Sequence, residues 1–245
     1  MIDAMNKFAV FAALIASLCL SSMTMAEDTA EGFVSIFPDT SLTGWVGGTT
    51  IDPSTITPEQ QAKWDAELHD HWRVEGDDLV SDGHSPHLVT AREYRDFELL
   101  VDWNLAPNGD SGVYLRDTPQ VQLWDPENEA AHKHGAQKGS GALWNNNGRG
   151  KWPLGPADKP TGEWNTMTVR MVGPYVRVVL NHKLVVDDAP LENYFDRSAP
   201  VFSEGRIHLQ THGSETRFRR LLVREIEPAE SKSLITEIES RPKSD

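Results

Sequence analysis

Residues able to do chemistry gather in the stretch Ser111 to Asp125, which reads SGVYLRDTPQVQLWD. Two runs of alternating apolar and polar residues are joined there by a turn that contains Pro119, so the stretch predicts a strand pair. Between the apolar positions lie a guanidinium (Arg116), a side-chain amide (Gln122) and a carboxylate (Asp125). A plain solvated sheet favours Thr, Ser and Lys at such positions. These side chains therefore point to a polar ligand.

Other expected strands also carry polar residues on one face, because side chains alternate across a strand. In GRIHLQT, His208 and Gln210 point together, and continuing the strand adds His212. In DFELLVDW, Glu98 lies opposite the apolar side chains. One face of each strand suits a core, and the other suits a groove where aromatic rings stack on sugars and polar groups bind hydroxyls. The alternative is an ordinary solvated outer sheet.

Short strands dominate the chain and must position these groups. Runs of alternating residues end at Gly, Pro, Asn or Asp, as strands do. We expect strands at 33–37, 72–76, 78–81, 87–90, 96–103, 112–116, 120–124, 141–144, 163–172, 175–180, 183–187, 205–211 and 216–226. Many short strands separated by turn signals predict an all-β sandwich or barrel.

One helix is expected, over 58–71, where Thr57 and Gln60 have capping-box spacing and Pro58 takes the first helical position. Its apolar residues form no clean stripe, so a short surface helix in an insertion is predicted. The segment 126–162 is long and rich in Gly, Asn, Pro and Lys. Loops of this length in compact domains are usually functional or disordered. The charged tail after Glu227 is expected to fray.

Composition and the N-terminus limit the function. The 245 residues carry a formal net charge of −14, which disfavours nucleic acid and anionic lipid as partners. Residues 1–26 read as a secretory signal peptide, with Lys7, a short apolar run, and Thr24 and Ala26 before the cleavage point. We therefore expect an exported, periplasmic or extracellular protein. The chain has 1 Cys, Cys19, so the mature chain has none and a thiol mechanism is excluded.

The sequence demands no cofactor, although a divalent cation could bind. Zinc is disfavoured because the close histidine pairs lie in loops or at a helix end, with no Cys to support them. Calcium is favoured over zinc in so acidic a chain, with Asp-rich loops at 77–82 and 187–188 as sources of ligands. The histidine pairs are His69/His71, His84/His87 and His132/His134.

Motifs ordered along almost the whole chain resemble the 3-keto-disaccharide hydrolase family. The resemblance covers residues 31–227 and leaves 228–245 as a charged C-terminal tail. It implies a concanavalin-like or laminarinase-like jelly-roll sandwich of two antiparallel sheets, with ligands bound across the concave sheet. Many members carry a Glu at the position of Gln120. The matching stretches are LTGW, HWRVEGDDLVSDG, YRDFELLVDW, GDSGVYLR, PQVQLWD, GSGALWNN, ADKPTGEWNTMTVRMVG, LNHKLVVD, ENYFDRSAP, GRIHLQTHG and RFRRLLVREI.

The resemblance implies cleavage of glycosides whose sugar a separate oxidoreductase has first oxidised to a ketone at C3. The ketone acidifies the proton on C2. A base removes that proton, the group on C1 leaves by elimination, and addition of water completes a net hydrolysis. This route needs a base, a group that stabilises the enolate oxygen and an acid for the leaving oxygen. It does not need the paired carboxylates of an ordinary glycosidase.

On this hypothesis, Arg116 with Gln122 holds the ketone or enolate oxygen. Asp125 or His212 is the base, and Glu98 is a reserve candidate. A divalent cation either replaces or assists Arg116 as the electrophile. Hydroxyl binding and ring stacking are assigned to Trp144, Asn145 and Gln210.

Each assignment has a structural alternative. Asp125 could cap the turn before Pro126, Arg116 could be the buried ion-pair partner of Glu98 or Asp102, and His212 could be an ordered core histidine. The function has alternatives as well. A noncatalytic, lectin-like sugar-binding module needs the hydroxyl-binding groups without a base. Hydrolysis of unoxidised glucan would need a cluster of carboxylates on one strand, which the sequence lacks.

Overall fold

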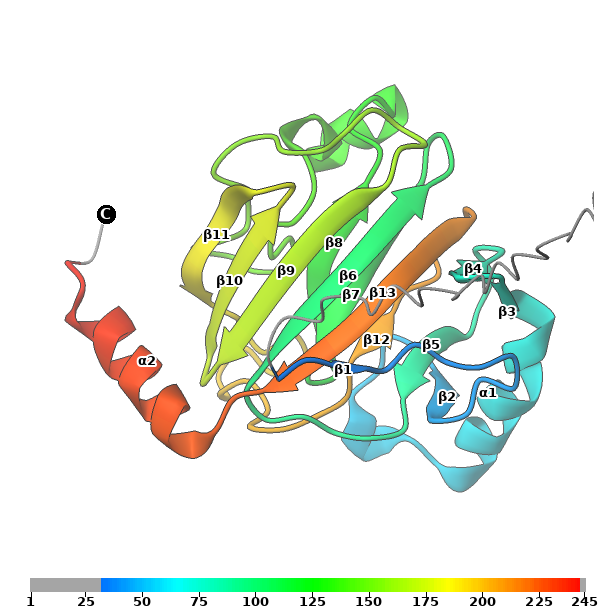
Figure 1. Ribbon diagram of the computed structural model, residues 1–245, viewed down its shortest axis with the longest axis horizontal. Helices are drawn as coiled ribbons and strands as arrows, with labels where there is room; N and C mark the ends of the chain where they lie inside the picture. Colours follow the sequence, from blue (N-terminus) through cyan, green and yellow to red (C-terminus); the bar gives the residue numbers. More distant parts are fainter. Residues whose placement is uncertain (1–31, 243–245) are drawn as a thin grey trace, which may run out of the picture.

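Alternation of apolar and polar residues builds two antiparallel sheets that pack face to face (Figure 1). The computed structural model describes residues 32–242; the expected signal peptide at 1–26 lies outside them. The larger sheet has eight strands. Its order is β11 (Lys183–Pro190), β10 (Tyr175–Leu180), β9 (Asn165–Val172), β6 (Phe97–Leu105), β13 (Thr216–Glu225), β4 (Asp78–Ser81) and β3 (Trp72–Glu75), with β1 (Val34–Ser35) pairing with β13.

The smaller sheet has five strands and lies behind the larger sheet in Figure 1. Its order is β2 (Trp45–Gly48), β5 (His87–Thr90), β12 (His208–Leu209), β7 (Asp110–Leu115) and β8 (Thr118–Trp124). The sandwich of two antiparallel sheets confirms the predicted jelly-roll fold. The strand expected at 141–144 does not form, whereas β2 was not predicted.

The core lies between the sheets and is filled by alternate residues of each strand. In β6, Phe97, Leu99 and Val101 are fully buried, and their neighbours Met167 and Val169 in β9 of the same sheet are fully buried as well. Strand β8 differs, because all seven of its residues are buried. Its apolar side chains fill the core, so another segment of the chain must cover the polar side chains on its other face.

Helix α1 (Pro58–His71) matches the predicted helix, including its capping box. Thr57 Oγ1 accepts from the Gln60 amide, and Gln60 Oε1 accepts from the Thr57 amide. One side chain of the helix, Leu68, is buried, in agreement with a surface insertion. Short 3-10 helices form at η1 (Pro53–Thr55), η2 (Glu129–His134) and η3 (Ala136–Lys138).

The tail, expected to fray, instead forms helix α2 (Pro228–Ser240). Pro228 begins it, and ionic and polar contacts hold it to the sandwich. Arg224 binds both oxygens of Glu230 at 2.9 and 2.8 Å, and Ser231 donates a hydrogen bond to Asp96. The contact with Asp96 is long-range in sequence and gives order to a segment whose own sequence signals are weak. No helix in the part of the chain that the structure describes is long and apolar enough to cross a membrane.

Candidate functional site

The polar face of the five-stranded sheet is the floor of a pocket of about 550 Å³. Residues of β7, β8 and the segment that follows β12 supply the floor, and the loops that follow β2, β8 and β11 supply the walls. The floor residues are Asp110, Tyr114, Gln120, Gln122, Trp124, Gln210 and His212. The walls are Thr50, Ala131, His134, Trp144, Asn145 and Tyr194.

The long loop after β8 reaches the pocket because it hydrogen-bonds to the edge of that strand. The Gly141 amide donates to the Gln122 carbonyl at 2.8 Å, and the Gln122 amide donates to the Ala142 carbonyl at 2.9 Å. These two hydrogen bonds, both to the backbone of Gln122, form in place of the strand expected at 141–144. It brings Trp144 and Asn145, a few residues on, to the wall of the pocket.

Asp110 and His212, two titratable residues of the pocket lining, lie in contact. His212 Nδ1 lies 3.4 Å from Asp110 Oδ2, and the His212 side chain is 62% exposed. Gln122 Nε2 donates to Asp110 Oδ1 at 2.7 Å and fixes the carboxylate from the other side. Burial raises the pKa of the Asp110 carboxyl, and the nearby His212 opposes that rise. A carboxylate and an imidazole in contact can take up and return a proton.

Two buried amide oxygens at the pocket have no hydrogen-bond partner among the described residues, namely Gln210 Oε1 and Asn145 Oδ1. Gln210 Nε2 already donates to the Tyr114 hydroxyl at 3.1 Å, so this amide has a fixed orientation. Buried polar atoms are nearly always paired in native structures. The two oxygens are therefore suited to accept hydrogen bonds from hydroxyls of a ligand.

Aromatic rings form one side of the pocket. The rings of Trp124 and Trp144 lie edge to face with centroids 6.1 Å apart. Trp144 Nε1 donates to the His134 carbonyl at 3.0 Å, which holds the ring in place. Apolar faces combined with a few oriented polar groups are typical of small-molecule sites.

Beside the pocket, on the same face of the sheet, lies a packed group of rings that keeps Tyr114 in place. His208 stacks on Tyr114 at 5.2 Å and contacts Asp117 through Nε2 at 2.8 Å. His87 meets the Tyr114 ring edge to face at 5.4 Å. Burial raises the pKa of the Tyr114 hydroxyl to about 12. Burial, with smaller effects of His208 and His212, lowers the pKa of His87 to about 3.

Five of the residues singled out in the sequence lie together in this lining. They are Gln122, Trp144, Asn145, Gln210 and His212. Glu98 does not join them, because it lies on β6 in the other sheet and contacts Arg224 Nε at 3.0 Å. The alternation along the strands identified the polar face but not which sheet each strand joins.

Arg116 also lies outside the pocket. The chain turns at Arg116 and Asp117, which have φ of 52° and 59°, so the alternation of β7 stops at Leu115. The Arg116 side chain is 2% exposed and binds Asp96 at 2.7 Å. Burial lowers its pKa to about 10, against the effect of Asp96. The structural alternative of a buried ion pair therefore fits, with Asp96 as the partner in place of Glu98 or Asp102.

Asp125 is occupied by loop contacts. Its carboxylate accepts from the amides of Asn108 and Glu127 at 2.8 and 2.9 Å and from Thr161 Oγ1 at 2.6 Å. Burial acts to raise its pKa, but the hydrogen bond from Thr161 and those from the two amides lower it overall. These contacts match the capping alternative and hold the long loop against the end of β7.

The sequence interpretation missed Asp110 and Tyr114 as site residues. Both share a face of β7 with Gly112, and register places Asp110 opposite Trp124 in β8. Extending the alternation backwards from Tyr114 would have found Asp110. The walls from η2 and the loop after β11 carry no such signal, because loops have no period.

Two aspartates of the loops expected to supply calcium ligands, Asp188 and Asp78, contact arginines of the chain itself. Asp188 contacts Arg170 and Arg177 at 2.9 Å and Arg241 at 2.7 Å. In the other loop, Asp78 lies 3.5 Å from Arg217. These carboxylates are neutralised by arginine, and neither lines the pocket.

Comparison with known proteins identifies the family of this chain. A family model described as a 3-keto-alpha-glucoside-1,2-lyase-like domain matches residues 32–224. A protein of Bacteroides thetaiotaomicron named 3-keto-disaccharide hydrolase is 23% identical, over 84% of this chain and 82% of its own length.

Solved structures agree on the fold. A candidate glycosyl hydrolase from Parabacteroides distasonis superposes with a TM-score of 0.58 and 22% identity, covering 79% of this chain and 99% of the other. A second one from that organism gives 0.57 and 20%, covering 80% and 84%. The match along most of the described sandwich shows that the chain belongs to the family of 3-keto-alpha-glucoside-1,2-lyase-like domains.

Proposed function

We propose that this protein is an exported carbohydrate-active enzyme that cleaves the glycosidic bond of 3-keto-glycosides. Family membership and the name of the Bacteroides relative support a carbohydrate substrate. The observation that carries the finer proposal is the charge content of the pocket. Among the described lining residues, Asp110 is the one carboxylate, and it contacts His212. Ordinary glycosidases mostly need two carboxylates on opposite sides of the bond.

Elimination from a 3-keto sugar fits a pocket with one carboxylate. His212 directs Nδ1 towards Asp110, which leaves Nε2 for the substrate. In the proposed reaction, Nε2 takes the proton from C2, the C1–O bond breaks, and a C1=C2 double bond forms. The proton held by His212 then passes to the departing oxygen. Addition of water places a hydroxyl on C1 and a proton on C2, which completes a net hydrolysis.

Asp110 is a positioning residue in this scheme. Its carboxylate orients the imidazole and stabilises the imidazolium that forms, as in other carboxylate–imidazole pairs. Gln122 in turn holds Asp110.

Tyr114 is proposed to stabilise the enolate. Tyr114 lines the pocket, and its hydroxyl, which contacts Thr50 Oγ1 at 2.5 Å, stays protonated at neutral pH, since its pKa is raised to about 12. A neutral hydroxyl of this kind can donate a hydrogen bond to the oxygen on C3 as charge develops there. Gln210 and Asn145 would accept from the sugar hydroxyls, and Trp144 would stack on a ring.

The protein is proposed to work after a separate sugar 3-oxidoreductase, because an unoxidised glycoside has no acidic C2 proton. Export is proposed from the N-terminal 26 residues, and residues 31–227 as the catalytic domain.

The test uses a matched pair of substrates, a glucoside and its 3-keto derivative, each with and without a chelator. Release of the aglycone from the keto substrate alone, above its spontaneous elimination, is expected. The chelator arm tests the divalent cation considered from the sequence. Equal turnover of both substrates would identify an ordinary glycosidase and refute the proposal.

A second measurement separates an enzyme from a sugar-binding module. In D₂O, the enzyme should exchange the C2 proton of a 3-keto sugar, and His212→Ala should abolish exchange while binding persists. Asp110→Asn should slow turnover by about 10²–10⁴-fold and change the pH profile. Binding of the keto sugar with neither exchange nor cleavage would support a lectin-like module.

A further inference from the structure

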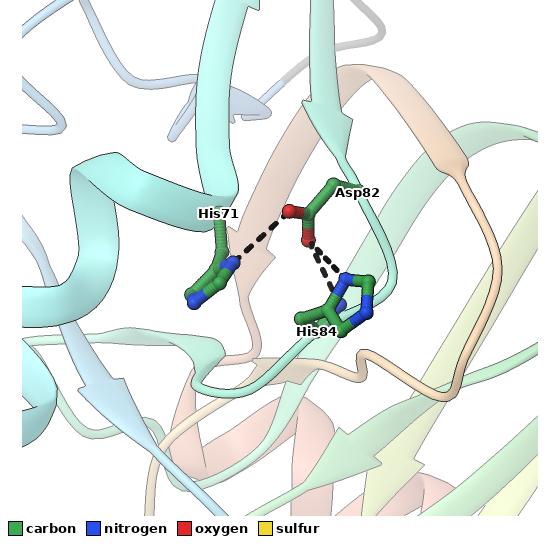
Figure 2. A group of neighbouring side chains, drawn as sticks. All are labelled: His71, Asp82 and His84. Carbon is green, nitrogen blue, oxygen red and sulfur yellow. Dashed lines mark hydrogen bonds and ion pairs between the residues drawn. The ribbon is translucent and has the colours of Figure 1, made fainter.

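Two histidines and an aspartate meet at the end of α1 (Figure 2), and none of the three lines the pocket. His71 ends α1, Asp82 follows β4, and His84 lies in the loop that leads to β5. His71 Nδ1 is 3.0 Å from Asp82 Oδ2, and His84 Nδ1 is 3.3 Å from Asp82 Oδ1. The ligand atoms of the three side chains all lie within 4.8 Å of one another.

We propose that His71, Asp82 and His84 bind a zinc ion. With metal–ligand distances of about 2.0–2.1 Å, the ligand atoms of a tetrahedral zinc site lie about 3.3 Å apart. Each imidazole lies near this spacing from one oxygen of the Asp82 carboxylate, His71 from Oδ2 at 3.0 Å and His84 from Oδ1 at 3.3 Å. Two imidazole nitrogens and one carboxylate suit zinc, whereas calcium and magnesium prefer oxygen ligands throughout.

The three ligands are held before any ion arrives. Asp82 Oδ1 accepts from the His84 amide at 2.8 Å, which fixes the loop around the carboxylate. Gly83 has a φ of +89°, and a Cβ there would lie 2.3 Å from the Ser214 nitrogen. The loop therefore rests directly on the backbone of the segment at 213–214, where the Gly213 amide donates to the Gly83 carbonyl at 2.8 Å.

An ion can reach the site from solvent and keep an open position. The side chains of His71, Asp82 and His84 are 27%, 37% and 72% exposed. Three protein ligands leave a fourth position for water or an outside ligand, the arrangement of zinc sites that are not purely structural.

Zinc here would connect α1 to the segment that carries His212. The loop of Gly83 packs on Ser214, and Ser214 Oγ accepts from the Asp110 amide at 3.2 Å. The proposed ion thus lies behind the backbone that supports the pocket, without contacting its lining.

The test is isothermal titration of the untagged full chain with Zn²⁺, Ca²⁺ and Mg²⁺ after removal of metals. We expect one zinc per chain and much weaker binding of the other two ions. His71→Ala and His84→Ala should each lower the zinc affinity at least about tenfold, because even outer-shell changes cost about 10–100-fold. His69→Ala, which removes an exposed histidine of the same helix, should bind zinc like the parent chain.

Melting temperatures provide a second readout, which shows whether a variant that does not bind zinc is still folded. Zinc should raise the melting temperature of the parent chain and of His69→Ala, but not that of His84→Ala. His84 is largely exposed, so the metal-free variant should melt like the parent chain. Unchanged zinc affinity in His84→Ala, or zinc binding no tighter than calcium binding, would overturn the proposal. Neither readout uses turnover, so failure here leaves the proposed reaction untouched.

Discussion

Acid should destabilise this protein strongly through one buried imidazole. Burial lowers the pKa of His87 from 6.5 to about 3, so the native state holds it neutral. Below pH 6.5 the unfolded chain binds a proton at this position that the native state does not, and stability therefore falls as the pH falls towards about 3. In this range each pH unit lowers the free energy of unfolding by about 1.4 kcal/mol. Between pH 6.5 and pH 4 the loss from this group is thus roughly 3 kcal/mol.

The assay is urea unfolding at several pH values, for the parent chain and His87→Phe. Phenylalanine keeps a ring beside Tyr114 but does not titrate. The difference between the two free energies of unfolding at pH 7.5 gives the packing effect of the substitution. That difference should shift by roughly 3 kcal/mol in favour of the variant at pH 4. Parallel pH dependences would show that native His87 binds its proton normally and would refute the reasoning.

Three further predictions concern single side chains. Arg116→Ala should lower the free energy of unfolding by about 3–5 kcal/mol in urea melts, because it leaves the Asp96 carboxylate without its buried partner. Tyr114→Phe should lower kcat on a 3-keto-glycoside by about 10²–10³-fold with a smaller change in KM, and an unchanged kcat would remove the hydroxyl from the reaction. Asp125→Asn should lower the melting temperature, since Thr161 and two amides lose an ionised acceptor. Its effect on turnover should stay well below that of the histidine substitution described above.

Much of the fold follows from local pattern. The period of two along the strands identified the core face, and the Thr57–Gln60 capping box set the start of α1. The same alternation brought Gln122 and Gln210 to the pocket, because neighbouring antiparallel strands present one common face. These features depend on residues close in sequence, which is why they could be predicted.

Other features depend on contacts that local pattern does not contain. Arg116 does not line the pocket, although the strand alternation predicted that it would. The chain turns at Arg116 and Asp117, which both have positive φ, so the alternation of β7 ends at Leu115. His71 and His84, which belong to different histidine pairs of the sequence, meet in space with ring centroids 5.8 Å apart. Helix α2 was missed because partners far away in the chain, such as Asp96, hold it.

Asp96 joins three distant parts of the molecule. It accepts from Arg116 in the β7–β8 turn, from the Gly173 amide in the β9–β10 turn and from Ser231 in α2. The helix, which follows the matched segment 32–224, is thus tied to turns of both sheets. Loss of the Asp96 contact should accordingly loosen the helix and speed hydrogen exchange of its amides with solvent.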